Sequence, residues 1–387
     1  LNVHDREHTK WQELKPASPF YLFVPRDEAW SQRYQEFMRV TEVFPLNGVG
    51  MTTARDEFVI DNQKHSLINR IRLFKHNTGS DDELHRYFSI RRKKGWSIRR
   101  AWNMLQELTD TQLTEHVVPV LYRPFDVRWI FYHDSVVWRT VKRVMRHMLT
   151  GENLAILASR QVVSHFRHAF VADAISNFNN IDIAGKFGSG YLFPLYLYPS
   201  ADRGDLFVHQ ESTERQPNLN PNLVVALTEA YGHEPTPEDI FHYVYAVLYA
   251  PAYREKYAEF LRRDFPRIPF TSDAGPFAKF AALGARLTAL HLLKSPELDL
   301  PACRFEGEGD SRIAKGKKAG LRYEPTEQRV YINPTQYFAP VLQEVWDYQV
   351  GGYQVCEKWL KDRRDRRLEF DDIRTYCRIV TALKLTL

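Results

Sequence analysis

Aromatic and β-branched residues alternate with cations along residues 121–199, a stretch that opens LYRPFDVRWIFYHD and closes GKFGSGYLFPLYLYP. This alternation predicts short strands with one basic face and one packed face. Over residues 121–170, eight Lys and Arg stand against three Asp and Glu, a net charge of +5 that equals the formal net charge of the whole chain. Because the positive charge is concentrated here, we expect the folded surface to bind a polyanion.

The 387-residue chain is too long for one small core. Residues 199–221 are polar and rich in Pro and Asn, and they form the best linker in the chain. We therefore expect a mixed α/β or α+β fold with two parts. A β-rich, mixed α/β subdomain over residues 1–200 carries the basic face, and a mainly helical subdomain with a small β element follows over residues 201–387.

Local patterns predict individual elements. Thr236 and Pro237 have the residue types of a helix N-cap and first turn, and Pro251 divides the helical pattern that follows. The other predictions are a strand running into a helix at 19–30, two strands at 43–60, basic helices at 66–100, a buried strand that ends at Arg160 and Gln161, a helix at 276–293, a loop at 304–320, a strand at 329–333, and helices near 343–348, 356–363 and 371–383.

Seven blocks of the sequence resemble one protein family in the same order. They are WQELKPASPFYLFVPRD, FPLNGVGMTTARDEFVI, LYRPFDVRWIFY, RHMLTGENLAILASRQ, YLFPLYLYP, PEDIFHYVYAVLYAPAYREKYAEFLRRDFPRIP and RVYINPTQYF…VWDYQVGGYQVCEKWLKDR. The family is the C-terminal specificity region of the single-chain type ISP restriction-modification enzymes, which is also found on related adenine-N6 DNA methyltransferases. The resemblance covers about residues 11–383. It implies a target recognition domain that reads a short asymmetric sequence in double-stranded DNA.

The resemblance also implies partners. In such enzymes a methyltransferase domain precedes this region in the same polypeptide, with helicase-like and nuclease domains further upstream, so we expect the chain to be a piece of a longer protein. The helical half would clamp DNA or dock on the methyltransferase domain. We expect a prokaryotic cytoplasmic location and no membrane partner, since no apolar run reaches the roughly 18 residues that a bilayer span needs.

We expect the chain itself to be non-catalytic. No Pro-Pro dipeptide is present, so the Asn/Asp-Pro-Pro-aromatic loop of an adenine methyltransferase is absent. Gly188-Ser189-Gly190 is too short for a methyl-donor turn, and residues 309–320 fail the phosphate-loop spacing. His165 and His168 lack the carboxylate or thiol neighbours of a metal site. No cofactor or metal is therefore expected in this chain, and S-adenosylmethionine is expected in the missing methyltransferase domain.

Two groups of cations are candidates for phosphate contacts, which supply affinity without sequence information. A run of flexible cations cannot all face bases, and for the first group a solvated helix face is the open alternative. The first group is Arg91, Arg92, Lys93, Lys94, Arg99 and Arg100; the second, at helical spacing, is Arg139, Lys142, Arg143 and Arg146.

Base reading favours planar groups with paired donors, such as Arg for guanine and Gln or Asn for adenine. Such residues gather where the buried strand should end and in a Gly-containing loop after it. The base-reading candidates are Arg160, Gln161, Ser164, His165, Arg167, Asn179, Asn180, Lys186 and Ser189. Arg123 and Arg128 flank Asp126, and we favour structural ion pairs for them over DNA contacts. Arg55 beside Asp56 leaves the same choice open.

Two functions other than DNA recognition are also compatible with these sequence patterns. One is a docking scaffold whose basic surface meets an acidic protein, and the other is a nuclease with an unrecognised active site. The only E-x-K of the sequence, Glu13-Leu14-Lys15, is weak support for the second. The DNA sequence that is read does not follow from these patterns.

Overall fold

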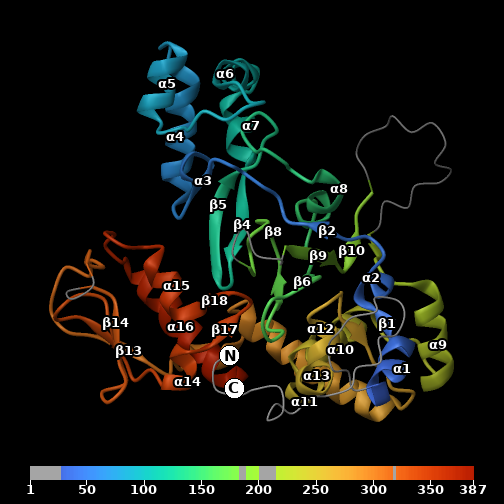
Figure 1. The fold of residues 1–387 in the computed structure, drawn as a ribbon. Coiled ribbons are helices and arrows are strands. Elements are labelled where there is room, and N and C mark those ends of the chain that lie inside the picture. The colour runs from blue at the N-terminus through green and yellow to red at the C-terminus, as the bar shows by residue number, and fades with distance from the viewer. Residues whose placement is uncertain (1–27, 183–188, 200–214, 317–319) are drawn as a thin grey trace, which may run out of the picture.

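The computed structural model describes residues 28–182, 189–199, 215–316 and 320–387, and these combine helices with several small sheets. The mixed α+β class predicted from the sequence is therefore confirmed. Figure 1 shows two sheets in the middle of the molecule, helices α3–α7 above them, a helical group beside β1, and the C-terminal elements on the opposite side. The apolar part predicted as a strand before residue 28 lies outside the described residues.

The first central sheet has the strand order β2-β9-β6-β7, with antiparallel neighbours throughout. Its strands are β2 (Gly48–Val49), β9 (Gly190–Pro194), β6 (Ala155–Ser159) and β7 (Ala169–Ala172). Every residue of β6 and β7 is buried, as expected for short apolar runs that are covered on both faces. The buried strand predicted to end at Arg160 and Gln161 is confirmed as β6, which ends one residue earlier, at Ser159.

The second central sheet has the order β3-β5-β4-β8. Its strands are β3 (Ile60–Asp61), β5 (Asp126–Phe131), β4 (Val117–Arg123) and β8 (Ile175–Ser176). The β4–β5 hairpin turns at Pro124 and Phe125, and Phe125 adopts a φ of +60° there. Thr52 and Met51 bridge to Arg139 and Asn177, so the segment between β2 and β3 joins the two sheets.

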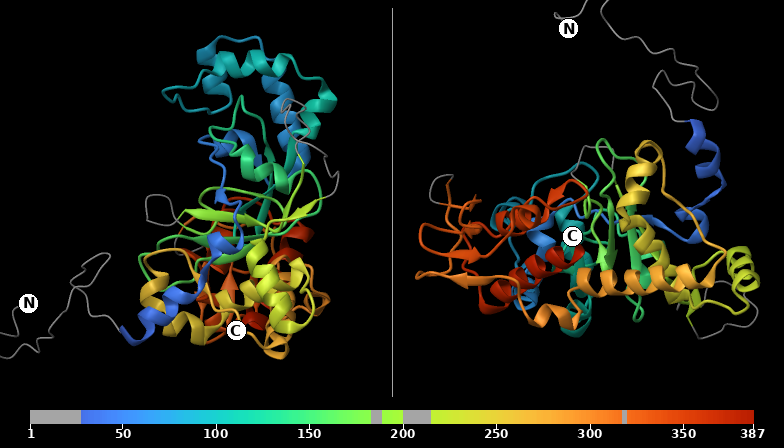
Figure 2. Two further views of the ribbon diagram at one scale, coloured as in Figure 1. Left: turned by 90° about the vertical axis from the view of Figure 1, so that its right-hand side faces the viewer. Right: turned by 90° about the horizontal axis from the view of Figure 1, so that it is seen from below.

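The segment 43–60 differs from the two predicted strands. It forms β2, then the short helix α3 (Asp56–Val59) and β3. Asp56 and Glu57 occupy the first turn of α3, where negative charge is favourable. The prediction of helices in residues 66–100 is confirmed by α4 (Lys64–His76), α5 (Asp81–Tyr87) and the start of α6 (Ile98–Gln106). These helices rise above the sheets together with α7 (Asp110–Glu115) (Figure 2). α8 (Lys142–Met145) and the 3-10 turn η1 (Arg146–Met148) follow along the chain.

A helical group covers the other side of the first sheet. The predicted Thr236 cap and Pro237 first turn are confirmed, and the chain breaks between helices at Pro251 as predicted. The helices of this group are α1 (Glu28–Glu36), α2 (Val40–Val43), α9 (Pro221–Tyr231), α10 (Pro237–Tyr249), α11 (Pro251–Lys256), α12 (Ala258–Leu261) and α13 (Ala274–His291). Its strand pairs are β1 (Met38–Arg39) with β12 (Arg267–Ile268), and β10 (Tyr196–Leu197) with β11 (Gln216–Pro217).

The C-terminal part combines a third four-stranded sheet with three helices. The predicted loop at 304–320 begins as a strand, because residues 304–306 pair with residues 337–339 far along the chain. The sheet strands are β13 (Arg304–Glu306), β16 (Tyr337–Ala339), β15 (Arg329–Tyr331) and β14 (Arg322–Glu324), and the other elements are η2 (Pro296–Asp299), α14 (Gln343–Trp346), β17 (Gln349–Val350), β18 (Tyr353–Gln354), α15 (Val355–Lys361) and α16 (Phe370–Thr386).

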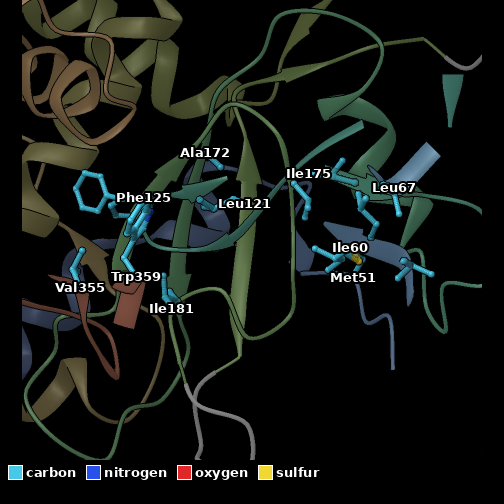
Figure 3. Close-up of a cluster of buried hydrophobic side chains, with 14 of the residues drawn as sticks. Met51, Ile60, Leu67, Leu121, Phe125, Ala172, Ile175, Ile181, Val355 and Trp359 are labelled. Carbon is cyan, nitrogen blue, oxygen red and sulfur yellow. The ribbon is translucent and has the colours of Figure 1, made fainter. Parts of the chain in front are cut away.

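Two hydrophobic clusters hold these parts together, and each takes residues from both sides of residue 200. The larger cluster extends from Met51 and from Leu67 of α4 to Val355 and Trp359 of α15 (Figure 3). The smaller one joins α2, β6 and β9 to α10–α13. The subdomain boundary at residues 200 and 201 stays a prediction, and the hydrophobic packing itself crosses it.

Candidate nucleic-acid interface

Five base-reading candidates lie on one exposed loop. This hairpin loop, residues 160–168, joins β6 to β7. Arg160, Gln161, Ser164, His165 and Arg167 are all exposed on it. Two apolar side chains of the same loop, Val162 and Phe166, are buried and anchor it to the smaller cluster. The loop therefore presents polar groups to solvent from a fixed base.

The two arginines of the hairpin loop have partners that are distant in sequence. Arg160 Nε donates to Asp264 Oδ1 at 3.0 Å, and Arg167 Nη1 donates to Gln349 Oε1 at 2.8 Å. The Arg160–Asp264 pair is largely exposed, with 59% and 42% of the two side chains accessible. Exposed pairs of this kind contribute about 0–1 kcal/mol, so a phosphate or base can replace Asp264 at little cost.

The remaining described candidates lie at the same end of the sheet. Gly190 pairs with Ser159 at the end of β6, so Ser189 stands beside the start of the hairpin loop. The segment 177–182, called the Asn segment, runs next to them, because Gly190 N donates to Phe178 O. Asn179 is half-buried in this segment.

Asn180 does not join this exposed set. The Asn180 side chain is fully buried: its Nδ2 donates to the Ser176 hydroxyl, and its amide group fills the space beside Gly190. It supports the Asn segment from inside the protein and does not face solvent. Lys186 lies outside the described residues.

The first group of phosphate candidates surrounds the start of α6. Arg91, Arg92, Lys93, Lys94 and Arg100 are exposed, and Arg99 is half-buried. Acids of α5 pair with two of the cations: Arg92 with Asp82, and Arg99 Nε with Asp81 Oδ1 at 2.8 Å. The group therefore carries less free charge than its sequence implies.

The second group stands beside the first. Lys93 Nζ lies 4.7 Å from the centre of the Trp138 ring, immediately before Arg139. The structure thus brings the loop before α6 to the loop before α8. The predicted helical spacing holds only in part, since α8 and η1 contain Lys142, Arg143 and Arg146 but Arg139 lies outside them and bridges to Thr52.

Hydrogen bonds hold part of this second group. Arg143 donates to the carbonyl oxygen of Asn47 at 2.6 Å, and Lys142 pairs with Asp134. Burial acts to raise the pKa of Asp134, but hydrogen bonds from Lys142 and Thr140 outweigh it and hold that pKa below its usual value. Lys142 is therefore neutralised by a carboxylate that stays ionised.

Two buried histidines that have arginines nearby are neutral at pH 7. Burial, followed by the charges of Arg146 and Arg143, lowers the pKa of His147 to about 4. Burial with the charges of Arg254 and Arg167 also lowers the pKa of His168 to about 4. The 3.6 Å approach of His168 Nε2 to Asp182 Oδ2 is therefore not a charge pair at neutral pH.

The predicted structural pairing of Asp126 is confirmed for Arg128 and differs for Arg123. Asp126 binds Arg128 at 2.6 Å and also Arg363, which follows α15, at 2.9 Å. Burial acts to raise the pKa of Asp126, but these two cations hold it well below its usual value. Arg123 instead donates to Asn177 Oδ1 at 3.3 Å, which ties β4 to the Asn segment.

Arg55 is also structural. Its side chain is 6% exposed, stacks over the Trp96 ring at 3.7 Å, and donates to Val136 O at 2.9 Å. Burial lowers the pKa of Arg55 to about 10, so it remains a cation at neutral pH. Asp56 forms its hydrogen bonds with Thr53 and Tyr122.

Sequence patterns missed the residues that hold the hairpin loop from outside. Asp264 and Gln349 are separated from their arginine partners by 104 and 182 positions. Gly351-Gly352 between alternating residues is a hairpin signal, but no local pattern says which loop such a hairpin contacts.

The described ranges contain no group of three or more His, Cys, Asp or Glu that could hold a metal ion. Within the same ranges, no helix is long and apolar enough to cross a membrane.

Several solved structures resemble this chain, and one of them is a DrdV–DNA complex, with a TM-score of 0.70 and 22% identity over 99% of this chain and 40% of that one. Another is a nuclease-deletion mutant of the Type ISP restriction-modification enzyme LlaGI in complex with a DNA substrate mimic, with a TM-score of 0.67 and 19% identity over 98% of this chain and 30% of that one. A further one is the ATP-dependent Type ISP restriction-modification enzyme LlaBIII bound to DNA, with a TM-score of 0.63 and 19% identity over 91% of this chain and 24% of that one. The chain thus spans less than half the length of each of these chains. The comparison with curated proteins gave no match.

The similarity to solved structures extends over nearly all of the chain and shows its fold. The family assignment comes from the sequence itself. The model of the Type ISP C-terminal specificity domain matches residues 42–386, which include both central sheets, both groups of cations and the C-terminal helices. The chain therefore belongs to the Type ISP C-terminal specificity domain family.

Proposed function

We propose that this chain is the target recognition domain of a restriction-modification enzyme and reads double-stranded DNA. The observation that carries the proposal is the hairpin loop, which presents exposed Arg160, Gln161 and Arg167 together from a buried strand pair. Family membership and the DNA complexes of the structural relatives support it.

The proposed division of labour follows from the chemistry of the exposed groups. Arg160, Gln161 and Arg167 carry the donor patterns that distinguish base edges in the major groove. The cations near Lys93 and Arg143 are distributed over the loop before α6, α6 itself, α8 and η1. They suit phosphate contacts that position the protein. Each phosphate contact releases counterions, so binding should weaken steeply as salt increases.

Catalysis is proposed for a methyltransferase domain that precedes this region in the same polypeptide, acting on adenine N6 in the prokaryotic cytoplasm. That domain would bind S-adenosylmethionine as the methyl donor. Gly190, the described end of the Gly188-Ser189-Gly190 run, offers no open space to a methyl donor, because it is paired in β9 and the Asn180 side chain occupies the space next to it.

The test is binding of the 387-residue chain to a duplex pool at several salt concentrations. We expect log Kd to rise linearly with log salt, and Arg143→Ala with Arg146→Ala to reduce the slope by up to about 1 for each phosphate that the variant no longer binds. Arg304→Ala, an exposed arginine of β13, is the matched control and should leave the slope unchanged. A flat salt response of the parent chain would contradict the proposal.

Charge reversal separates DNA reading from the docking-scaffold alternative. Arg160→Glu with Arg167→Glu should abolish selective DNA binding if the hairpin loop reads bases. Intact DNA binding together with failed assembly on an acidic protein would favour the scaffold.

A further inference from the structure

One turn near the C-terminus contacts both segments that carry the base-reading candidates. Gly351 N donates to Arg167 O of the hairpin loop at 2.7 Å. The next residue, Gly352, donates from its N–H to Ile181 O of the Asn segment at 3.0 Å. The β17–β18 turn therefore links two segments that belong to different strand connections.

Side chains of the β17–β18 hairpin add to this link between the hairpin loop and the Asn segment. The Tyr353 hydroxyl lies 2.9 Å from Asn179 O and 2.8 Å from Asp182 O, so its single proton is shared by two carbonyls of the Asn segment. Tyr353 is 7% exposed, and a hydrogen bond in such surroundings is stronger than one in water. On the other strand, Gln349 Oε1 accepts from Arg167 Nη1.

Glycine is required at the point of contact. Gly351 has a φ of +58°, and a Cβ at this position would stand 1.5 Å from Ile181 O. Any side chain would therefore force the turn away from the Asn segment.

The β17–β18 hairpin itself is firmly anchored. It runs directly into α15, and Val355 and Trp359 of that helix are buried in the same cluster as Ile181 (Figure 3). Just beyond α15, Arg363 binds the buried Asp126. The hairpin loop and the Asn segment have little regular structure of their own, so their geometry depends on such outside contacts.

We infer that the β17–β18 hairpin is a positioning element that sets the base-reading geometry of the hairpin loop and the Asn segment. Tyr353 and Gln349 are its positioning residues, acting through Asn179 and Arg167. The inference rests on the proposed function. Paired hydrogen bonds to base edges need closely defined donor positions, whereas phosphate contacts tolerate movement. Loosening the β17–β18 hairpin should therefore reduce discrimination between DNA sequences more than it reduces the affinity for DNA.

The first test uses the DNA-free 387-residue chain and amide hydrogen exchange. Tyr353→Phe should speed exchange in residues 179–182 by about fivefold, the effect of losing one net hydrogen bond of about 1 kcal/mol. Tyr323→Phe is the matched control, since it removes a hydroxyl that donates to Val341 O at 2.8 Å in the C-terminal sheet. Unchanged exchange in residues 179–182 of Tyr353→Phe would overturn the inference.

The second test selects duplexes from a randomised pool with the parent chain, Tyr353→Phe, Gln349→Ala and Tyr323→Phe. Tyr353→Phe and Gln349→Ala should broaden the selected sequence, with an unchanged salt slope and a Tm loss no greater than that of Tyr323→Phe. An equally narrow selection by both variants would overturn the positioning role. If the parent chain selects no sequence, the proposed function and the reading role fail together, while the exchange experiment still decides whether the hairpin holds the Asn segment.

Discussion

At the scale of single residues, the chain separates its cations into buried structural ones and exposed ones. Arg128 and Arg363 share the fully buried Asp126, whereas Arg160 meets Asp264 at the surface. Removing one partner should cost more stability at the buried Asp126 than at the exposed Arg160–Asp264 pair, because it leaves an uncompensated charge inside the protein.

Asp126→Asn should therefore lower the free energy of unfolding by about 3–5 kcal/mol. Asp264→Asn, at an exposed pair, should lower it by less than about 1 kcal/mol. Urea denaturation of both variants measures the difference. Equal losses would show that the Asp126 cluster contributes no more than a surface pair.

A buried histidine makes stability depend on pH. His291 is 2% exposed and bonds to Tyr245 and Thr386, and burial with the charge of Arg254 lowers its pKa to about 3. An unfolded histidine has a pKa of about 6.5, so the unfolded chain binds the extra proton between these two values. Stability from His291 is thus full above about pH 6.5 and lost as pH falls, at up to about 1.4 kcal/mol per pH unit.

Urea unfolding between pH 7.5 and 4.5 checks this dependence. His291→Gln should flatten the decline in unfolding free energy, even if the variant is less stable at every pH. His233→Gln, at an exposed position, controls for the substitution itself. An identical pH slope in parent and His291→Gln would contradict the expected role.

At the scale of elements, two closely packed helices, α10 and α13, support the first central sheet. Helices α10 and α13 approach so closely that a Cβ on Gly284 would stand 1.8 Å from His242 O. Both helices also contact β7, the strand that begins at the end of the hairpin loop. The distance between α10 and α13 therefore affects the position of β7, and with it the end of the hairpin loop in the candidate interface.

Gly284→Ala should destabilise the chain by about 1–3 kcal/mol, since backbone atoms cannot move aside as a flexible side chain can. Gly275→Ala in the same helix is the control, because its added Cβ would meet only an Asp273 side-chain oxygen at 3.3 Å. Thermal unfolding of the two variants measures the contrast. A Tm of Gly284→Ala at or above that of Gly275→Ala would contradict the packing argument.

At the scale of the whole molecule, the two hydrophobic clusters are built across the chain. The larger one joins residues 51–192 to residues 290–383, and the smaller one joins residues 34–44 and 156–196 to residues 219–281. A fragment that ends at residue 200 thus loses apolar partners from both clusters.

Residues 28–200 expressed alone should show no cooperative urea transition, and the same should hold for residues 201–387. Co-expression of the two fragments should restore a folded complex that co-purifies. A sigmoidal transition of residues 28–200 alone would instead support an independent subdomain with the boundary near residue 200.

The sequence predictions succeeded where the determining interactions are local. The Thr236 cap, the Pro237 first turn and the apolar run that ends at Ser159 act within a few residues, and all three are confirmed. The strand prediction at residues 43–60 failed in part, because β-branched residues there share the segment with Asp56 and Glu57 at the start of α3. Asn180 illustrates the limit for the site, since its burial depends on Gly190 from another strand.

Local periodicity, ordered blocks and composition are properties of the amino-acid sequence, and they were enough to predict the fold class, the family and the concentration of cations in the middle third. Which of these cations are exposed became clear from the folded chain. Arg128 is held by Asp126, Arg160 meets Asp264, and Arg167 meets Gln349 of a hairpin 182 residues away. A side chain's exposure and partners depend on packing between distant segments, and a local pattern carries no information about that packing.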